Sequence, residues 1–152
     1  MSRVQLALNV SDLDEAITFY SRLFQTLPAK VRPGYANFAV DEPSLKLVLL
    51  EGVGEAGSVN HLGVEVASTE DVMAATTRFI GAGLQPEVED RTTCCYAVQD
   101  KVWVDGPDGA RWEIYAVLAD AEGVESLGGD QHCCTSTSVE PIAASASSTG
   151  CC

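Results

Sequence analysis

Hydrophobic and polar residues alternate at the start of the chain and then change to a helical spacing. The segment VQLALNV (4–10) alternates as expected of a strand with one buried face. Ser11 and Asp12 then offer a helix N-cap, and apolar residues follow at intervals of three or four: Leu13, Ile17, Tyr20 and Phe24. Strand-like segments follow at about 29–32, 35–40 and 45–51. The pattern predicts a βαβββ unit.

The second half of the chain repeats this order at an offset of 56 residues, since HLGVEV (61–66) aligns with QLALNV (5–10). The apolar phase of the helical segments matches at the same offset. Strand-like pieces complete the repeat at about 86–91, 97–104 and 112–118. We therefore predict an α+β fold of two βαβββ modules, about 1–54 and 58–119. Together they would form one curved mixed sheet, with helices outside and a concave cup inside.

Residues 120–152 have a different character. They are rich in Gly, Ser, Thr and Ala, show no periodicity, and carry His132 and four cysteines. Such a segment buries too little apolar area to offset chain entropy. We predict one domain over 1–119, followed by a disordered tail.

Composition and charge exclude some classes of partner. Apolar residues make up 46% of the chain and charged residues 20%, as in an ordinary soluble protein. The net charge of −13 repels phosphate backbones and anionic membranes, so neither nucleic acid nor a membrane is an expected partner. We find no signal peptide and no run of about 18 apolar residues, and expect a cytoplasmic protein.

The six cysteines form three adjacent pairs: Cys94-Cys95, Cys133-Cys134 and Cys151-Cys152. Neighbouring cysteines are poor disulfide partners for each other, and a reducing cytosol favours thiols. The pairs therefore point to metal chemistry more than to a disulfide framework.

Three residues in the two modules are candidate ligands of a metal ion harder than those that thiols prefer. His61 begins the first strand of the second module, and Gln5 holds the equivalent position in the first. Glu113 lies among large apolar residues in WEIYAV, where a carboxylate faces water, another charge or a metal. Together they could bind a divalent first-row ion with positions left open. A structural role for His61 is the more common alternative. Other residues could line the cup, but charged side chains near strand ends, such as Lys101 and Arg111, usually face water.

Several segments resemble the vicinal-oxygen-chelate superfamily, which includes glyoxalase I, extradiol dioxygenases and fosfomycin-resistance enzymes. They are QLALNVSDLDEAITFYSRLF, HLGVEV and GPDGARWEIY, within residues 1–118 or so. The resemblance places the superfamily's metal positions on Gln5, His61 and Glu113. Gln5 stands where most of the superfamily has histidine, and an amide oxygen is a weaker ligand than imidazole.

TCCYAVQDKVWV is the most specific of the segments that resemble the ArsI/CadI-type group, which comprises carbon–arsenic lyases and cadmium-induced proteins. The resemblance implies that Cys94 and Cys95 bind trivalent arsenic and that Fe(II) at Gln5, His61 and Glu113 activates dioxygen. The implied reaction cleaves the carbon–arsenic bond of methylarsenite or trivalent aromatic arsenicals to release arsenite.

Alternatives remain open at this level. The chain could sequester Cd(II) or arsenite without turnover, and the tail pairs Cys133-Cys134 and Cys151-Cys152 could capture such soft ions. A glyoxalase-like isomerase using Ni or Zn is a third reading, and Co is a further alternative metal for the cup. A monomer and a homodimer are both compatible with two modules in one chain.

Overall fold

A computed structural model describes residues 2–94 and 96–121 of the chain. The elements, in chain order, are β1 (Arg3–Val10), α1 (Leu13–Phe24), β2 (Lys30–Arg32), β3 (Tyr35–Val40), β4 (Leu45–Glu51), β5 (Val59–Glu65), α2 (Thr69–Gly81), β6 (Glu87–Cys94), β7 (Ala97–Asp105), a 3-10 turn (Pro107–Gly109) and β8 (Arg111–Asp120). The predicted tail, with His132 and its four cysteines, lies outside the described residues apart from its first two positions. No helix within the described ranges is long and apolar enough to cross a membrane.

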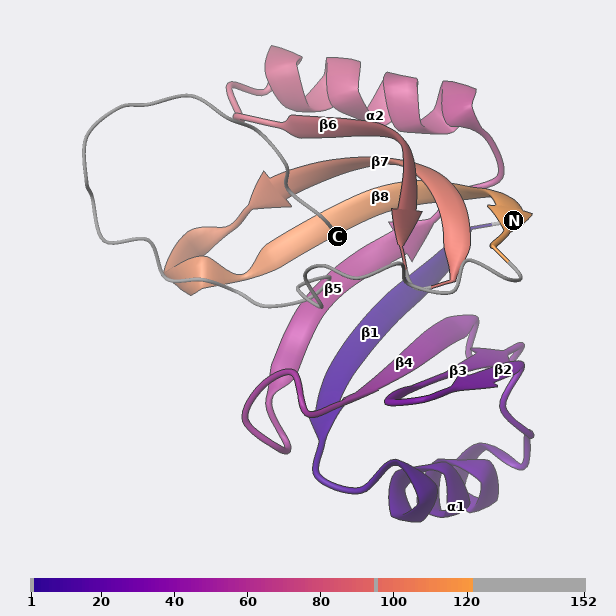
Figure 1. Cartoon of the computed structure of the whole chain (residues 1–152). Helices are drawn as coiled ribbons and strands as arrows, with labels where there is room; N and C mark the ends of the chain where they lie inside the picture. Colours follow the sequence, from indigo (N-terminus) through magenta and orange to yellow (C-terminus); the bar gives the residue numbers. More distant parts are fainter. Residues whose placement is uncertain (1, 95, 122–152) are drawn as a thin grey trace.

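The two predicted βαβββ modules form one curled sheet of eight strands, in the order β2-β3-β4-β1-β5-β8-β7-β6. Within the modules, β1 runs parallel to β4 and β5 parallel to β8. The modules meet where β1 pairs antiparallel with β5. Figure 1 shows the sheet curling between α2 at the top and α1 at the bottom. The predicted fold is confirmed.

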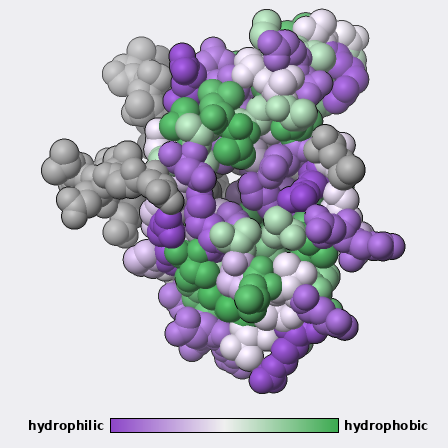
Figure 2. All heavy atoms as spheres, turned by 90° about the vertical axis from the view of Figure 1, so that its right-hand side faces the viewer, coloured by the Kyte–Doolittle hydropathy of each residue, from purple (hydrophilic) through white to green (hydrophobic). Residues whose placement is uncertain are grey.

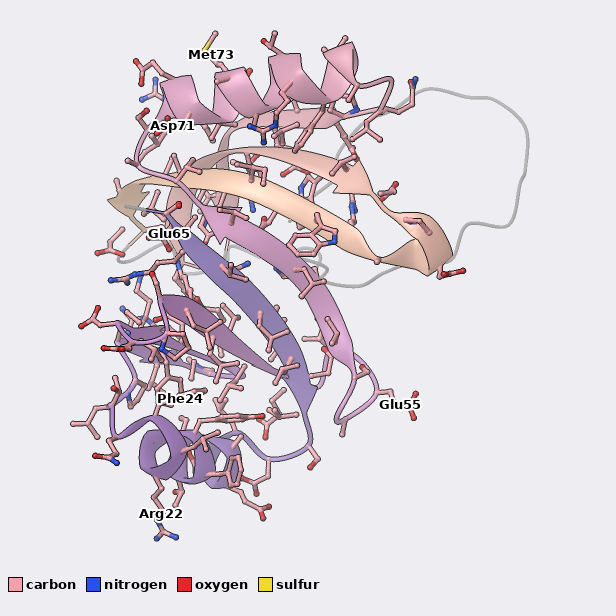
Figure 3. The ribbon with its side chains drawn as sticks, turned by 180° about the vertical axis from the view of Figure 1, so that it is seen from behind. Arg22, Phe24, Glu55, Glu65, Asp71 and Met73 are labelled. Carbon is pink, nitrogen blue, oxygen red and sulfur yellow. The ribbon has the colours of Figure 1, made fainter. Side chains whose placement is uncertain are left out.

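Each helix packs its apolar stripe on the outer side of the sheet. The α1 stripe meets the outward side chains of β1, β3 and β4 around Phe38, Leu47 and Leu49. Figure 3 shows Phe24 on the side of α1 that faces the sheet and Arg22 on the opposite side. The predicted N-cap is confirmed, because the Asp12 side chain accepts a hydrogen bond from the Glu15 amide. Ser68 caps α2 in the same manner.

The inner face of the sheet is more polar than the outer face. Along β1 every second residue, Gln5, Ala7 and Asn9, is buried, as the period of a strand requires. Buried polar side chains from several strands include Gln5, Asn9, Asn37, His61, Gln99, Lys101 and Glu113. Buried polar groups need partners, so this face is where a functional site is to be sought.

One predicted boundary is wrong. The strand expected at about 86–91 extends to Cys94, because pairing with β7 resumes at Thr92 after an irregularity between Glu89 and Thr92. Arg91 has a φ of 50° there, which is the local kink that lets the strand continue. Cys94 is therefore the last residue of a paired strand, and this pairing fixes the direction of its side chain.

The surface of the described residues carries no single continuous apolar area on the face seen in Figure 2. That face shows apolar areas in its upper and lower parts with hydrophilic residues between them. Exposed apolar side chains occur on both modules, for example Leu27 and Met73. Scattered exposure of this kind is ordinary for a soluble protein.

Candidate metal and thiol site

Strand register brings two of the predicted ligands into one row on the inner face. Gln5 on β1 pairs with Gly63 on β5, and Gly63 pairs with Glu113 on β8. The missing side chain at Gly63 is what lets the outer two meet. A Cβ atom there would lie 2.8 Å from Glu113 Cγ and 3.5 Å from Gln5 Cβ. His61, two residues before Gly63, projects from the same face.

The three predicted ligands converge on one point. Gln5 Nε2 lies 3.1 Å from His61 Nε2 and 2.5 Å from Glu113 Oε1, and the last two atoms are 3.4 Å apart. The residues are 4%, 7% and 3% exposed, respectively. Neighbouring ligand atoms each about 2.1 Å from a first-row ion are about 3 Å apart. The three side-chain ends are therefore spaced as the ligands of one metal ion are, with Gln5 presenting its amide nitrogen to the other two.

The donor set is unusual in its third member. Among the described residues, no three His, Cys, Asp or Glu side chains gather at one place. A metal here would be held by a histidine, a carboxylate and an amide oxygen. Such a set has one negative charge and suits a divalent first-row ion with open positions.

The ring of His61 is oriented by its neighbours. Its Nδ1 lies 2.7 Å from Asn60 Oδ1, and the Asn60 amide nitrogen donates to Asn9 Oδ1 at 3.0 Å. This contact fixes the plane of the ring so that Nε2 faces the triad. Trp103 packs edge-on against the ring at 5.5 Å between centroids.

Lys101 is buried beside the triad, so the expectation that it faces water is wrong. It is 1% exposed, and its Nζ lies 3.1 Å from Glu113 Oε2. Its place on the inner face follows from the strand period that it shares with Gln99 and Trp103. Arg111 instead lies at the surface with its guanidinium over the Trp103 ring.

The carboxyl of Glu113 stays ionised in this environment. Burial raises its pKa, but the adjacent His61 ring and the Lys101 ammonium lower it by more than that, so the net result is a pKa of about 2. Lys101 bonds one carboxylate oxygen, whereas Gln5 and His61 face the other. One oxygen is thus directed at the place where an ion would sit.

Cys94 lines the same cavity as the triad. The cavity has a volume of about 20 Å³, which is room for an ion or a water molecule but not for a benzene ring, and its walls are Gln5, Tyr35, Lys46, Val48, His61, Cys94, Gln99, Lys101 and Glu113. Within the described part of the chain, Gln99 Oε1 has no hydrogen-bond partner and is available to a bound molecule. A larger, shallow hollow of about 800 Å³ lies against α1 and shares no residue with the triad.

The redox state of Cys94 differs from the prediction. Cys94 is 2% exposed and disulfide-bonded in the structure, whereas the sequence led us to expect a thiol. Thiol and disulfide interconvert by a two-electron reduction, so the reductant present decides between them. Cys95, Cys133, Cys134, Cys151 and Cys152 lie outside the described residues.

The turn after Cys94 is held against the first module. Lys30 Nζ donates to the Tyr96 carbonyl at 3.1 Å, and the Arg32 guanidinium lies over the Tyr96 ring. The rings of Tyr35 and Tyr96 pack at 5.6 Å. Through these contacts the end of the β6–β7 hairpin, which belongs to the second module, packs against β2 and β3 of the first module.

Several residues that contact the triad or extend its hydrogen-bond network were missed by the sequence reasoning: Lys46, Asn60, Glu65 and Tyr115. Tyr115 had a usable signal, because it lies two residues after Glu113 and so shares its face of β8. Lys46 and Glu65 had none, since their approach depends on which strands become neighbours.

Comparisons with known proteins agree with the fold. Residues 3–114 match the model of the Glyoxalase/Bleomycin resistance protein/Dioxygenase superfamily. The chain is 66% identical over 122 residues to "Cadmium-induced protein CadI" of Mycobacterium tuberculosis H37Rv, with 80% of each chain covered. It is 58% identical over 136 residues to the "Trivalent organoarsenical cleaving enzyme" of Thermomonospora curvata, with 89% of each covered.

Among solved structures, the 2,3-dioxygenase LapB of Pseudomonas sp. KL28 superposes with a TM-score of 0.58 at 16% identity. The match covers 82% of this chain and 44% of that one. At this identity the likeness concerns the fold alone.

Proposed function

This chain belongs to the Glyoxalase/Bleomycin resistance protein/Dioxygenase superfamily, and we propose that it cleaves the carbon–arsenic bond of trivalent organoarsenicals with Fe(II) and dioxygen. The observation that carries the proposal is that Cys94 lines one small cavity together with Gln5, His61 and Glu113. A thiol that binds arsenic and a site that holds a metal would then act on the same molecule. The relative named as a trivalent organoarsenical cleaving enzyme supports the substrate class.

Gln5, His61 and Glu113 would hold the iron through an amide oxygen, Nε2 and one carboxylate oxygen. The set resembles the two-histidine, one-carboxylate arrangement of non-haem oxygenases, with an amide in place of one imidazole. When bound, Fe(II) supplies a redox centre that binds and activates dioxygen. Asn60 would keep the His61 lone pair directed at it, and Lys101 would keep the second oxygen of Glu113 occupied.

Cys94 and Cys95 would hold the arsenic as thiolates, because trivalent arsenic is thiophilic. The arsenic-bound carbon would then lie within the cup. Overall, CH₃As(OH)₂ and O₂ would give As(OH)₃ and HCHO: the carbon–arsenic bond breaks, the carbon is oxidised, and arsenic stays trivalent. Because the cavity is small, methylarsenite, which is smaller than the aromatic arsenicals, is the substrate to test first.

The test is arsenite release from methylarsenite by the full chain, kept reduced because Cys94 is able to form a disulfide. Protein loaded in turn with Fe(II), Co(II), Ni(II) or Zn(II) would be assayed in air and under argon. We expect release with Fe(II) in air only, and its loss in His61→Ala, Glu113→Gln and Cys94→Ser. Release that persists under argon, or in Cys94→Ser, would overturn the proposal.

A second candidate function is sequestration of Cd(II) or arsenite without turnover. It is favoured by the 66% identical relative, whose name records induction by cadmium. Under this alternative the reduced chain would bind Cd(II) tightly, removing residues 122–152 would weaken binding, and no metal would support arsenite release. Glyoxalase-type isomerase activity has no use for the cysteine next to the triad.

A further inference from the structure

The side-chain amide of Gln5 presents the wrong atom to a metal. Its NH₂ group donates to Glu113 Oε1 at 2.5 Å and lies 3.1 Å from His61 Nε2. Its oxygen points the other way and accepts from Tyr115 Oη at 2.5 Å. An amide nitrogen has its lone pair delocalised and carries two hydrogens, so only the oxygen is a ligand. A metal ion cannot join this triad until the amide turns over.

Behind Gln5 lies a chain of polar groups able to accept such a turn. Tyr115 Oη lies 3.1 Å from Glu65 Oε2 as well as close to Gln5. The same Glu65 oxygen accepts from Lys46 Nζ at 2.8 Å, and that ammonium also lies over the Tyr115 ring. Glu65 and Tyr115 are register partners on β5 and β8, so their approach is built into the sheet.

Tyr115 has one hydroxyl proton and two acceptors within reach. While it donates to Gln5, the amide oxygen is held away from the triad. If it donates to Glu65 instead, its own lone pairs face Gln5 and can accept from the NH₂ group. In the first arrangement Tyr115 donates to Gln5, and Glu65 is satisfied by Lys46 alone. In the second, Tyr115 donates to Glu65 and accepts from the Gln5 NH₂ group, so none of the three side chains loses all its partners.

We propose that metal binding turns over the Gln5 amide, and that Tyr115 holds the amide oxygen on the metal by passing its hydroxyl hydrogen bond from Gln5 to Glu65. This rests on the proposed metal centre. Tyr115 and Glu65 are positioning residues that act through Gln5. A neutral amide is a weaker metal ligand than imidazole. It serves as the third ligand here because a buried partner fixes its orientation.

The test is Fe(II) affinity, measured anaerobically by competition with a chromogenic chelator. Tyr115→Phe leaves the turned NH₂ group without its acceptor, and we expect affinity to fall about 10- to 100-fold. Glu65→Leu removes the acceptor of the tyrosine proton and should weaken binding about 3- to 10-fold, whereas Glu65→Gln retains an acceptor oxygen and should restore it to within about twofold.

Controls are provided by matched residues outside the chain of bonds. Tyr20→Phe removes the hydroxyl of a partly buried tyrosine on α1, which packs on the outer face of the sheet and does not line the cavity. Glu55→Leu removes a carboxylate on the connector before β5. Figure 3 shows Glu55 near the opposite end of that strand from Glu65. Neither control should change Fe(II) affinity by more than about twofold.

A double variant shows whether the two residues act in series. Because Glu65 acts through Tyr115, Tyr115→Phe combined with Glu65→Leu should bind no more weakly than Tyr115→Phe alone. Additive losses, failure of Glu65→Gln to restore affinity, or an unchanged Tyr115→Phe would overturn the inference and leave the metal centre standing. A wild-type chain that binds no Fe(II) would overturn both.

Discussion

The Nζ atom of Lys101 lies 3.1 Å from Glu113 Oε2, and both side chains are almost entirely buried. The two oxygens of the Glu113 carboxylate therefore have different partners. One oxygen is neutralised by the ammonium, while the other faces Gln5 and His61. A carboxylate in this position is held ionised before any metal arrives, so metal binding need not displace a proton from it.

Removing the ammonium should therefore destabilise the metal-free protein. Lys101→Met leaves the buried charge of Glu113 without its partner, and we expect the free energy of unfolding to fall by about 3–5 kcal/mol. Chemical denaturation in the presence of a chelator measures it. Lys46→Met is the matched control, because the Lys46–Glu65 pair is more exposed and should cost about 1 kcal/mol. Equal losses in the two variants would contradict the role given to Lys101.

The same carboxylate predicts how stability depends on pH. The pKa of Glu113 is lowered from 4.5 to about 2 in the folded chain, so its contribution is complete above pH 4.5 and is lost as the pH falls toward 2. We expect the metal-free wild type to lose about 3 kcal/mol more than Glu113→Gln across this window. Denaturation curves between pH 7 and pH 2.5 give the comparison. Parallel pH profiles would show that Glu113 is not held ionised by its neighbours.

Gly63 should tolerate no side chain. A Cβ at this position would lie 2.8 Å from Glu113 Cγ and 3.0 Å from the Glu113 carbonyl oxygen, and backbone cannot easily yield. Gly63→Ala should cost about 1–3 kcal/mol of stability and weaken metal binding. Gly81→Ala, at the end of α2 with open space around it, should be close to neutral. Thermal unfolding and Fe(II) titration of both variants test this, and a Gly63→Ala protein that matches Gly81→Ala would refute it.

Asp100 should be a structural residue and not a catalytic one. Its carboxylate accepts from Thr69 Oγ1 at 2.5 Å and from the Arg91 amide at 2.8 Å, which ties the kink of β6 to the start of α2. These two hydrogen bonds lower its pKa. Asp100→Ala should reduce the free energy of unfolding by about 2–4 kcal/mol, with Fe(II) affinity retained. The exposed Asp90→Ala should change stability by less than about 0.5 kcal/mol. Lost Fe(II) affinity in a folded Asp100→Ala protein would contradict this assignment.

The fold could be predicted because the sequence patterns that indicate it lie within single segments and occur twice in the chain. The alternation of β1, the stripe of α1 and the 56-residue offset each follow from spacing within one segment. The convergence of Gln5 with His61 was suggested by the same offset, since equivalent positions of two modules meet where β1 pairs with β5.

The remainder of the site depends on register between distant strands, which the period of two does not determine. Gly63 matters only because it stands between Gln5 and Glu113 in one row. Lys101 is inward because β7 pairs with β8 at Tyr115, and the direction of the Gln5 amide is set by Tyr115 itself. Those relationships arise from the assembled sheet.

If the triad and the thiol act together on one organoarsenical, oxygen uptake and arsenite release must occur in a fixed ratio. Reduced, Fe(II)-loaded protein would be given methylarsenite in a closed cell, with dissolved oxygen and released arsenite followed together. We expect one O₂ to be consumed for each arsenite released, over many turnovers. Methylarsenite that disappears into the protein at one equivalent or fewer per chain, without oxygen uptake or arsenite release, would show a sequestering protein and contradict this expectation.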